Sequence, residues 1–227
     1  MPSKARRIPR PTAQRLSLYL REMRPMMAQG RSTLSSRELG EKLGIPSAQV
    51  RKDLSWLVQS HETRQSGQAG VGYNCLALSQ SVRQVIGTDR KWSTLLVGSG
   101  NIGRALLGYG GFMQDGFPIT AVVDSDPRIV GKKIGGLVVA PISALTRVIR
   151  SKRIAIAILA VPRSAAQAVA TQLCAAGIRG ILNFAPMRIS VADGVSVINI
   201  DVSVALEQLS MDILMRDQVR LSEEGAA

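Results

Sequence analysis

The stretch Gly98–Gly103, GSGNIG, follows a short apolar run, Thr94–Val97, and opens a segment of helical character, Ile102–Met113. A carboxylate, Asp124, closes the next apolar run 21 residues after the last glycine. A Gly-x-Gly-x-x-Gly turn between strand and helix, with an acidic residue about 20 positions further on, is the dinucleotide-binding fingerprint. We therefore expect residues 89–202 to form a Rossmann domain.

Each glycine of this turn has its own physical task. Gly98 permits the tight turn, Gly100 lets a pyrophosphate approach the backbone, and Gly103 lets the helix pack closely on the strand. The free N–H groups at the start of the helix would hold the phosphates. Asp124 is expected to accept hydrogen bonds from the adenine-ribose hydroxyls and to repel a 2′-phosphate, which favours NAD over NADP. Three cations follow closely and limit that preference: Arg128, Lys132 and Lys133.

Further apolar runs predict additional strands, with helical stretches between them. The expected strands are Ile119–Val123, Gly135–Val139, Ile154–Ala160, Gly180–Leu182 and Val195–Ile200, and the expected helices are Ile142–Ile149 and Ser164–Ala176. Nearly continuous apolar runs are typical of parallel strands that are buried on both faces. The alternation therefore predicts an α/β fold with a doubly wound parallel sheet.

Two of these runs end in motifs placed to contact a ligand. Open α/β sheets bind ligands at the carboxyl ends of their strands. We expect the residues there to wall a nicotinamide pocket, with ordinary turn chemistry as the alternative: Val161, Pro162, Asn183 and Phe184. The other residues expected to bind the dinucleotide are Gly98, Ser99, Gly100, Asn101, Ile102, Gly103, Tyr109 and Asp124.

The positive charge of the chain is concentrated in its first part. Residues 1–90 hold 15 Lys and Arg against 6 Asp and Glu, whereas residues 91–227 hold 14 against 10. This asymmetry indicates an anionic macromolecular partner, with nucleic acid ahead of a membrane surface; a merely solubilising surface is the alternative.

The composition also indicates the compartment. No apolar run reaches the roughly 20 residues that span a bilayer, and the basic Met1–Arg10 is not followed by the apolar region of a signal peptide. The two cysteines, Cys75 and Cys174, fit no metal spacing. We expect a cytoplasmic protein with no membrane partner and no metal.

Residues 1–88 are expected to form a winged-helix DNA-binding domain. Thr12 is expected to cap a first helix that ends at Gly30. A second helix starts at Ser35, with Glu38 completing a capping box, and stops at Gly44. The third starts at Ser47, and this helix–turn–helix layout is typical of DNA-binding modules.

The third helix and the segment after it supply the candidate DNA contacts. Its apolar residues, Val50, Leu54 and Leu57, share one face and leave polar and cationic side chains for the other. A glycine-rich stretch follows and leads into a strand-like Tyr73–Leu76, as expected of a wing. The predicted DNA-contacting residues are Ser47, Gln49, Arg51, Lys52, Ser55, Arg64, Gly70, Gly72 and Tyr73.

The chain resembles the Rex-type redox-sensing transcriptional repressors, in which a winged helix is fused to a Rossmann domain. The resembling segments run in order along the chain: Ile8-Pro9, Arg15-Leu16 and Tyr19, Val50–Ser55, Gly70–Tyr73, Gly98–Gly103, Tyr109 with Gly111-Phe112, Asp124–Pro127, Ile181–Pro186 and Asn199–Asp201. The chain departs from the family pattern between Ser55 and Gly70. That segment is longer than usual and has Gln68 and Ala69 where a Lys or Arg is expected, so Arg64 is the candidate substitute.

The resemblance implies a homodimer that binds palindromic operator DNA and releases it when NADH is bound. NADH and NAD would then act as effectors that are not turned over. It also implies that the C-terminal helix within residues 203–227, with Leu206, Leu209 and Ile213 on one side, exchanges between subunits as a dimerisation helix. Three residues match a switch: Arg15, Tyr109 and Asp201. Asp201 would pair with Arg15 in one state and with Tyr109 in the other.

Two other functions remain as alternatives. An NAD-dependent oxidoreductase needs a proton donor or acceptor near the nicotinamide. The single histidine, His61, lies in the basic N-terminal part of the chain, and no tyrosine has a lysine four residues later. We therefore expect no enzyme and no catalytic residue. The other alternative is a nucleotide-binding interaction protein that does not bind DNA.

Overall fold

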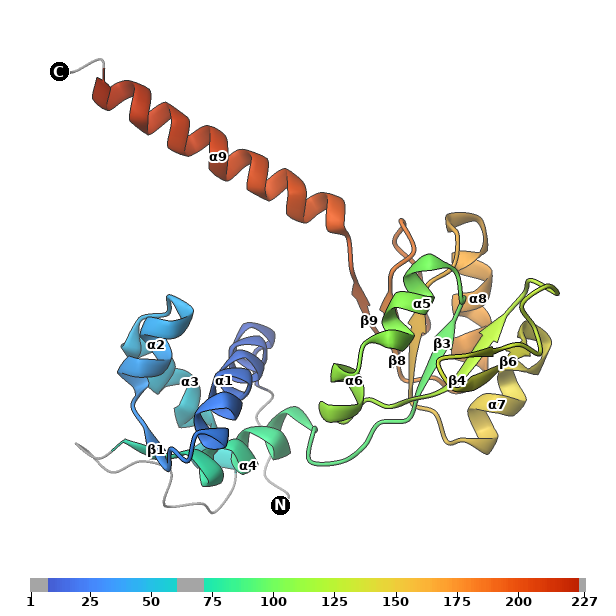
Figure 1. The fold of residues 1–227 in the computed structure, drawn as a ribbon, viewed down its shortest axis with the longest axis horizontal. Helices are drawn as coiled ribbons and strands as arrows, with labels where there is room; N and C mark the ends of the chain where they lie inside the picture. The colour runs from blue at the N-terminus through green and yellow to red at the C-terminus, as the bar shows by residue number, and fades with distance from the viewer. Residues whose placement is uncertain (1–7, 61–71, 225–227) are drawn as a thin grey trace. The chain divides into compact units, whose positions relative to one another are not determined.

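The computed structural model describes residues 8–60 and 72–224 (Figure 1). The chain divides into two compact units, Met1–Lys91 and Trp92–Ala227. We call them the head and the nucleotide unit and describe each by itself.

The head is a helical bundle with a small two-stranded sheet. Its elements are α1 (Arg10–Ala28), β1 (Thr33–Leu34), α2 (Ser36–Leu43), α3 (Ser47–Ser60), β2 (Tyr73–Asn74) and α4 (Cys75–Ile86). β1 pairs with β2 in antiparallel fashion. The core of the head is built from all four helices and includes Leu16, Met23, Leu39, Val50, Leu54, Leu57, Leu78 and Val82. The helix–turn–helix predicted from the sequence is therefore present and is closed by a fourth helix.

Local sequence signals explain where α2 begins and ends. The Ser35 hydroxyl accepts a hydrogen bond from the backbone N–H of Glu38, and the Glu38 carboxylate accepts one from the N–H of Ser35, which confirms the capping box. The ion pair with Arg31 and these capping bonds lower the pKa of Glu38 to about 2. At the other end, Gly44 adopts a left-handed conformation with φ of 66°.

Two predictions about the head are wrong. Thr12 does not cap the first helix, because α1 already begins at Arg10 after Pro9, and the Thr12 hydroxyl is buried and donates to Asp53. The strand predicted at Tyr73–Leu76 stops at Asn74. The Asn74 side chain accepts a hydrogen bond from the N–H of Ala77 and so caps α4.

The nucleotide unit is built on a seven-stranded sheet of order β5-β6-β4-β3-β7-β8-β9. All neighbours are parallel except β5 and β6. Its strands are β3 (Thr94–Val97), β4 (Ile119–Asp124), β5 (Lys133–Ile134), β6 (Leu137–Pro141), β7 (Ile156–Leu159), β8 (Gly180–Asn183) and β9 (Ser196–Asn199). Its helices are α5 (Asn101–Gly108), α6 (Gly111–Gln114), α7 (Leu145–Ser151) after a short 3-10 turn (Ile142–Ala144), α8 (Arg163–Ala175) and α9 (Val202–Glu224). The predicted doubly wound sheet is confirmed.

Alternate residues of the central strands enter different cores, because successive side chains of a strand point to opposite faces. Leu95 and Val97 of β3 belong to the core that also contains residues of α7 and α8. Leu96, between them, belongs to a second core, against which Leu106 of α5 packs. Helices therefore cover both faces of the sheet, and the strand order reverses between β3 and β7. Such a reversal creates a crevice at the carboxyl ends of the strands.

The single helix predicted at Ile102–Met113 is interrupted. α5 ends at Gly108, and Tyr109 has φ of −80° and ψ of 101°, which is extended backbone. Glycines at positions 108, 110 and 111 surround it, and glycine is a poor helix former. A side chain at Gly111 would collide with the Tyr109 ring. The break leaves Tyr109 at 55% exposure, in edge-to-face contact with Phe112.

The last helix, α9, exposes large apolar side chains on two opposite sides. At 100° per residue, Val202, Leu206, Leu209 and Ile213 form one stripe, and Val204, Met211 and Met215 form the other. All seven are between 47% and 65% exposed. The prediction of one apolar side was therefore incomplete.

Among the residues with a described placement, no helix is long and apolar enough to cross a membrane. Within the same residues, no cluster of three or more His, Cys, Asp or Glu is arranged to hold a metal ion.

Candidate functional site

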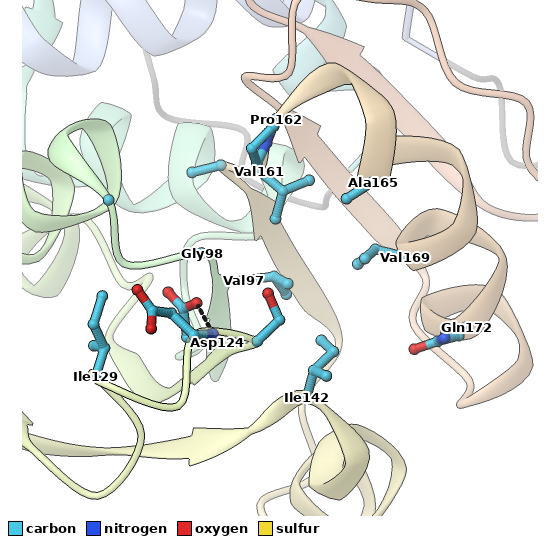
Figure 2. A pocket seen from close by; sticks show the side chains of 14 residues that line it. Val97, Gly98, Asp124, Ile129, Ile142, Val161, Pro162, Ala165, Val169 and Gln172 are labelled. Atoms are coloured by element: carbon cyan, nitrogen blue, oxygen red, sulfur yellow. Dashed lines mark hydrogen bonds between the residues drawn. The ribbon is translucent and has the colours of Figure 1, made fainter.

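A cavity of about 470 Å³ opens at the carboxyl ends of β3, β4 and β7, at the point where the strand order reverses (Figure 2). Five of the predicted nucleotide-binding residues line it: Gly98, Gly100, Asp124, Val161 and Pro162. Figure 2 shows Gly98, Asp124, Val161 and Pro162 around one space, with Asp124 beside Gly98. The structure therefore brings together residues from three separate loops, as an open α/β sheet requires.

Two glycines of the turn are required by close backbone contacts. Gly98 has φ of 91°, and a Cβ there would collide with the carbonyl oxygen of Ala160, at the end of β7. A Cβ on Gly103 would collide with the carbonyl oxygen of Gly98, so the first turn of α5 could not pack on the strand. Gly100 differs, because a Cβ there meets no atom within 4 Å. Its missing side chain leaves space in the cavity itself.

The Asp124 carboxylate is fixed by the turn that it faces. Its Oδ2 accepts hydrogen bonds from the backbone N–H and the hydroxyl of Ser99, at 2.7 and 2.6 Å, and its Oδ1 accepts one from the N–H of Asp126. Burial raises the pKa of the Asp124 carboxyl, but these hydrogen bonds outweigh it and hold the pKa below its usual value. Asp124 is therefore an anion held in a fixed position at the wall of the cavity.

The rest of the cavity is mainly apolar and was missed by the sequence analysis. Ala165, Val169 and Gln172 of α8 line it, together with Ile129 and Ile142. The α8 residues are spaced i, i+4 and i+7, so they share one helix face. Ile142 directly follows the carboxyl end of β6. Both signals, helical periodicity and position at a strand end, are visible in the sequence. An apolar lining of this kind suits the flat face of an aromatic ring system.

Other predicted nucleotide contacts lie outside this cavity. Asn183 is fully buried, and its side-chain amide donates to the Met187 carbonyl and to Asn199 and accepts from the N–H of Ala185. Its observed role is thus to fix the end of β8. Phe184 packs against the core on one face of the sheet. Asn101 and Ile102 form the exposed first turn of α5, and Tyr109 follows its last turn.

In the head, the predicted DNA contacts on α3 divide into two groups. Arg51, Lys52 and Ser55 are exposed. Arg51 lies within 3.4 Å of the hydroxyls of Ser36 and Ser47, so it bridges the two helices of the helix–turn–helix. Gln49 is half-buried, and its amide donates to Asp53 at 2.9 Å. The cationic part of the predicted surface is therefore accessible, whereas Gln49 also has a structural partner.

The predicted wing is described only at its base. Gly72 has φ of 91°, and a Cβ there would lie 2.6 Å from the carbonyl oxygen of Leu34. Tyr73, in β2, pairs with Leu34 in β1. Arg64 and Gly70, with His61, fall outside the described residues.

The sequence analysis missed Asp53 as the polar centre of the head. Asp53 is 1% exposed, and its carboxylate accepts hydrogen bonds from Arg15 Nε and Nη2, at 2.6 and 2.8 Å, and from the Tyr19 hydroxyl at 2.8 Å. Thr12 and Gln49 complete the set. A signal was present, because Asp53 follows Val50 by three residues and precedes Leu57 by four. It therefore lies on the apolar face of α3, where a carboxylate needs partners.

The predicted switch residues have local partners of their own. Arg15, on α1, is paired with Asp53 through its Nε and Nη2 edge. The Asp201 carboxylate accepts a hydrogen bond from the N–H of Ser203 and so caps α9.

The comparisons with known proteins cover both units. Residues 7–55 match a family described as a putative DNA-binding protein N-terminus, and residues 89–187 match the CoA binding domain family. The redox-sensing transcriptional repressor Rex of Carboxydothermus hydrogenoformans is 42% identical over 91% of this chain and 97% of its own length. Its counterpart from Streptomyces coelicolor is 38% identical over 99% of this chain and 83% of its own.

Solved structures of RSP, a Rex-family repressor, are similar over nearly the whole chain. RSP in complex with NAD⁺ and operator DNA matches with a TM-score of 0.84 at 30% identity, covering 97% of this chain and 99% of RSP. RSP in complex with NADH matches with a TM-score of 0.81 at 30% identity, covering 94% and 97%. The preorganised Gly98 turn, the helix–turn–helix and these full-length matches lead to one conclusion: the chain belongs to the Rex family of redox-sensing transcriptional repressors.

Proposed function

We propose that this protein represses transcription by binding palindromic operator DNA as a homodimer, and that NADH bound at the Gly98 turn releases the DNA. The observation that carries the proposal is the full-length match to RSP, which has been solved with operator DNA and NAD⁺ and, separately, with NADH. In this proposal residues 1–88 bind DNA, residues 89–202 bind the dinucleotide, and residues 203–227 serve dimerisation.

The exposed face of α3 supports the DNA-binding part. Arg51 and Lys52 are cationic and exposed, and Ser55 lies beside them on the same helix. Side chains of these types bind phosphate oxygens and base edges. Arg64, Gly70, Gly72 and Tyr73 remain the proposed contacts of the wing.

The two apolar stripes of α9 support the dimer. Large exposed apolar patches mark interaction sites, and a helix with apolar stripes on opposite sides suits insertion between two surfaces. A second copy of this chain is the partner that the family likeness favours. Exchange of α9 between subunits would bury both stripes at once.

We further propose that the nucleotide is an effector and not a substrate, and that the protein acts in the cytoplasm, where operator DNA is accessible. A protein that transferred hydride from NADH to a small carbonyl at an enzymatic rate would contradict this. The absorbance of NADH at 340 nm, followed with a panel of carbonyl compounds, is the direct measurement.

The proposed release mechanism depends on Asp201. Asp53 occupies the Nε and Nη2 edge of the Arg15 guanidinium, so the Nη1 group is the part that would bind Asp201 in the DNA-bound state. In the NADH-bound state Asp201 would turn to Tyr109. The two states would then bind NADH and DNA oppositely, as coupling between sites requires.

Asp201→Asn is expected to abolish NADH-dependent release of DNA while NADH still binds. Asparagine keeps the cap on α9, since it is as good an N-cap as aspartate, but it has no charge to pair with Arg15. The expected result in a mobility shift is weaker DNA binding without nucleotide, because the pair with Arg15 is lost, and little further change in DNA binding at saturating NADH. Normal release by this variant would show that Asp201 is not part of the switch.

The proposal as a whole is tested by a mobility shift on a duplex selected from a random pool with the full chain. We expect a complex with NAD⁺ or with no nucleotide, its disappearance with NADH, and little effect of NADPH. Arg51→Gln with Lys52→Gln should weaken the complex and make the slope of log affinity against log salt shallower by about 1 for each removed cation that binds a phosphate.

The matched control removes the same two charges from the other unit, as Arg147→Gln with Arg150→Gln on α7, where both side chains are exposed. This variant should leave the salt slope unchanged. If NADH binds but no duplex is selected, the protein is a nucleotide-binding interaction protein and the DNA-binding proposal fails.

A further inference from the structure

The loop after β4 carries a second carboxylate that lines the cavity beside Asp124. Asp126 contributes to the wall together with Asp124 and Ser125. Its Oδ1 accepts a hydrogen bond from the backbone N–H of Arg128 at 2.9 Å, which forms a tight turn. The loop therefore holds the Asp126 carboxylate in place independently of any side-chain partner.

The same carboxylate forms an ion pair with the side chain of Arg128. Arg128 Nε lies 3.0 and 3.2 Å from the two Asp126 oxygens, and Nη2 lies 2.8 Å from Oδ2. This is the two-pronged geometry in which arginine also binds phosphate. The Arg128 side chain is 86% exposed, so nothing except this carboxylate is seen to fix it within the described part of the chain.

The placement matters for the choice of dinucleotide. In dinucleotide-binding domains an acidic residue at this strand end takes the ribose 2′-hydroxyl, whereas a nearby arginine accommodates a 2′-phosphate. This chain has both at the end of β4, where Asp124, Asp126 and Arg128 follow one another at every second position. As long as Arg128 is bound to Asp126, a 2′-phosphate meets two anions and no free guanidinium from this loop.

We propose that Asp126 determines nucleotide specificity by sequestering Arg128, which is otherwise a ready ligand for the 2′-phosphate of NADP(H). The proposal rests on the proposed binding of NAD(H) at the Gly98 turn. It adds a residue that would exclude the phosphorylated dinucleotide although a cation follows Asp124 closely in the chain.

The test is the affinity of the full chain for NADH and NADPH, measured separately by calorimetry. Asp126→Asn keeps the Oδ1 that accepts the Arg128 N–H and therefore keeps the turn, but it removes the charge that holds the guanidinium. NADPH should bind about fivefold more tightly or better, because NADPH no longer has to displace Arg128 from an exposed ion pair and no longer faces the charge of the Asp126 carboxylate. The affinity for NADH should stay within about threefold of the wild-type value, because a threefold change corresponds to less free energy than the loss of one hydrogen bond to a charged group.

The control is Asp126→Asn with Arg128→Gln, in which no guanidinium is present on this loop and NADPH affinity should return to the wild-type level. If Asp126→Asn binds NADH normally but gains nothing toward NADPH, the inference is overturned and the proposed function stands. A double variant that keeps the gain also overturns it, because Arg128 is then not the ligand. If the wild-type protein binds neither dinucleotide, the proposed function fails and this inference fails with it.

Discussion

Asp53→Ala is expected to destabilise the head by about 3 kcal/mol, as is usual when one partner of a buried ion pair is removed. The variant leaves the Arg15 guanidinium and the buried Tyr19 hydroxyl without their shared acceptor. It also cuts the polar link between α1 and α3, the helix proposed to contact DNA. The chain has two tryptophans, one in each unit. In a Trp92→Phe background the fluorescence of Trp56 therefore reports urea unfolding of the head alone.

The matched control is Glu41→Ala, which also removes the carboxylate of an Arg–carboxylate pair. The Arg37–Glu41 pair is 2.7 Å long, but its side chains are 84% and 62% exposed. Exposed pairs contribute little to stability, so the unfolding midpoint should not change measurably. Equal effects of the two substitutions would mean that the Asp53 cluster is not what holds α1 to α3.

The same cluster predicts a dependence on pH. Burial raises the pKa of the Asp53 carboxyl, but the hydrogen bonds from Arg15, Tyr19 and Gln49 outweigh it, and its pKa in the folded head lies below the ordinary value. The stabilisation is therefore complete above the unfolded-state pKa, near 4, and is lost as the pH falls through the lower folded-state value. The stability difference between the wild-type protein and Asp53→Asn should accordingly narrow in acid.

Much of the fold could be predicted because its signals are local. The Ser35 capping box, the Gly44 stop and the apolar strand Thr94–Val97 were all found where the sequence placed them. The errors arose where two local signals compete. Asn74 continues a strand-like run but caps the next helix, and Tyr109 continues an apolar helical pattern through three glycines that end it.

The candidate site could be predicted only in part, for a related reason. The glycine turn and Asp124 are identified by their spacing along the chain, which can be read directly from the sequence. The partners of a charged side chain cannot be read in this way, because they lie on other helices or depend on side-chain geometry. The role of Asp53 was therefore not predicted, although its position on an apolar helix face is visible in the sequence. The sequence likewise showed that Arg128 follows Asp124 closely, but only the structure shows that Arg128 is paired with Asp126.

Gly98→Ala and Gly100→Ala are both expected to weaken NADH binding, by about 10- to 100-fold, but for different reasons. At Gly98 the added Cβ collides with the Ala160 carbonyl at a φ of 91°. The two strands must shift, so the thermal unfolding temperature of the nucleotide unit should fall as well. At Gly100 the Cβ meets no protein atom, so stability should be unchanged and only the space for the pyrophosphate is reduced.

Gly108→Ala completes the comparison, because Gly108 is an exposed residue of α5 at which a Cβ also meets no atom within 4 Å. Alanine should leave NADH binding intact and stabilise the helix slightly, since it is the better helix former. Calorimetric titration with NADH and a thermal melt of each variant separate the three cases. A Gly100→Ala protein that binds NADH normally would mean that the pyrophosphate does not approach the backbone at this turn, and the fingerprint would then have no bearing on how the protein senses its nucleotide.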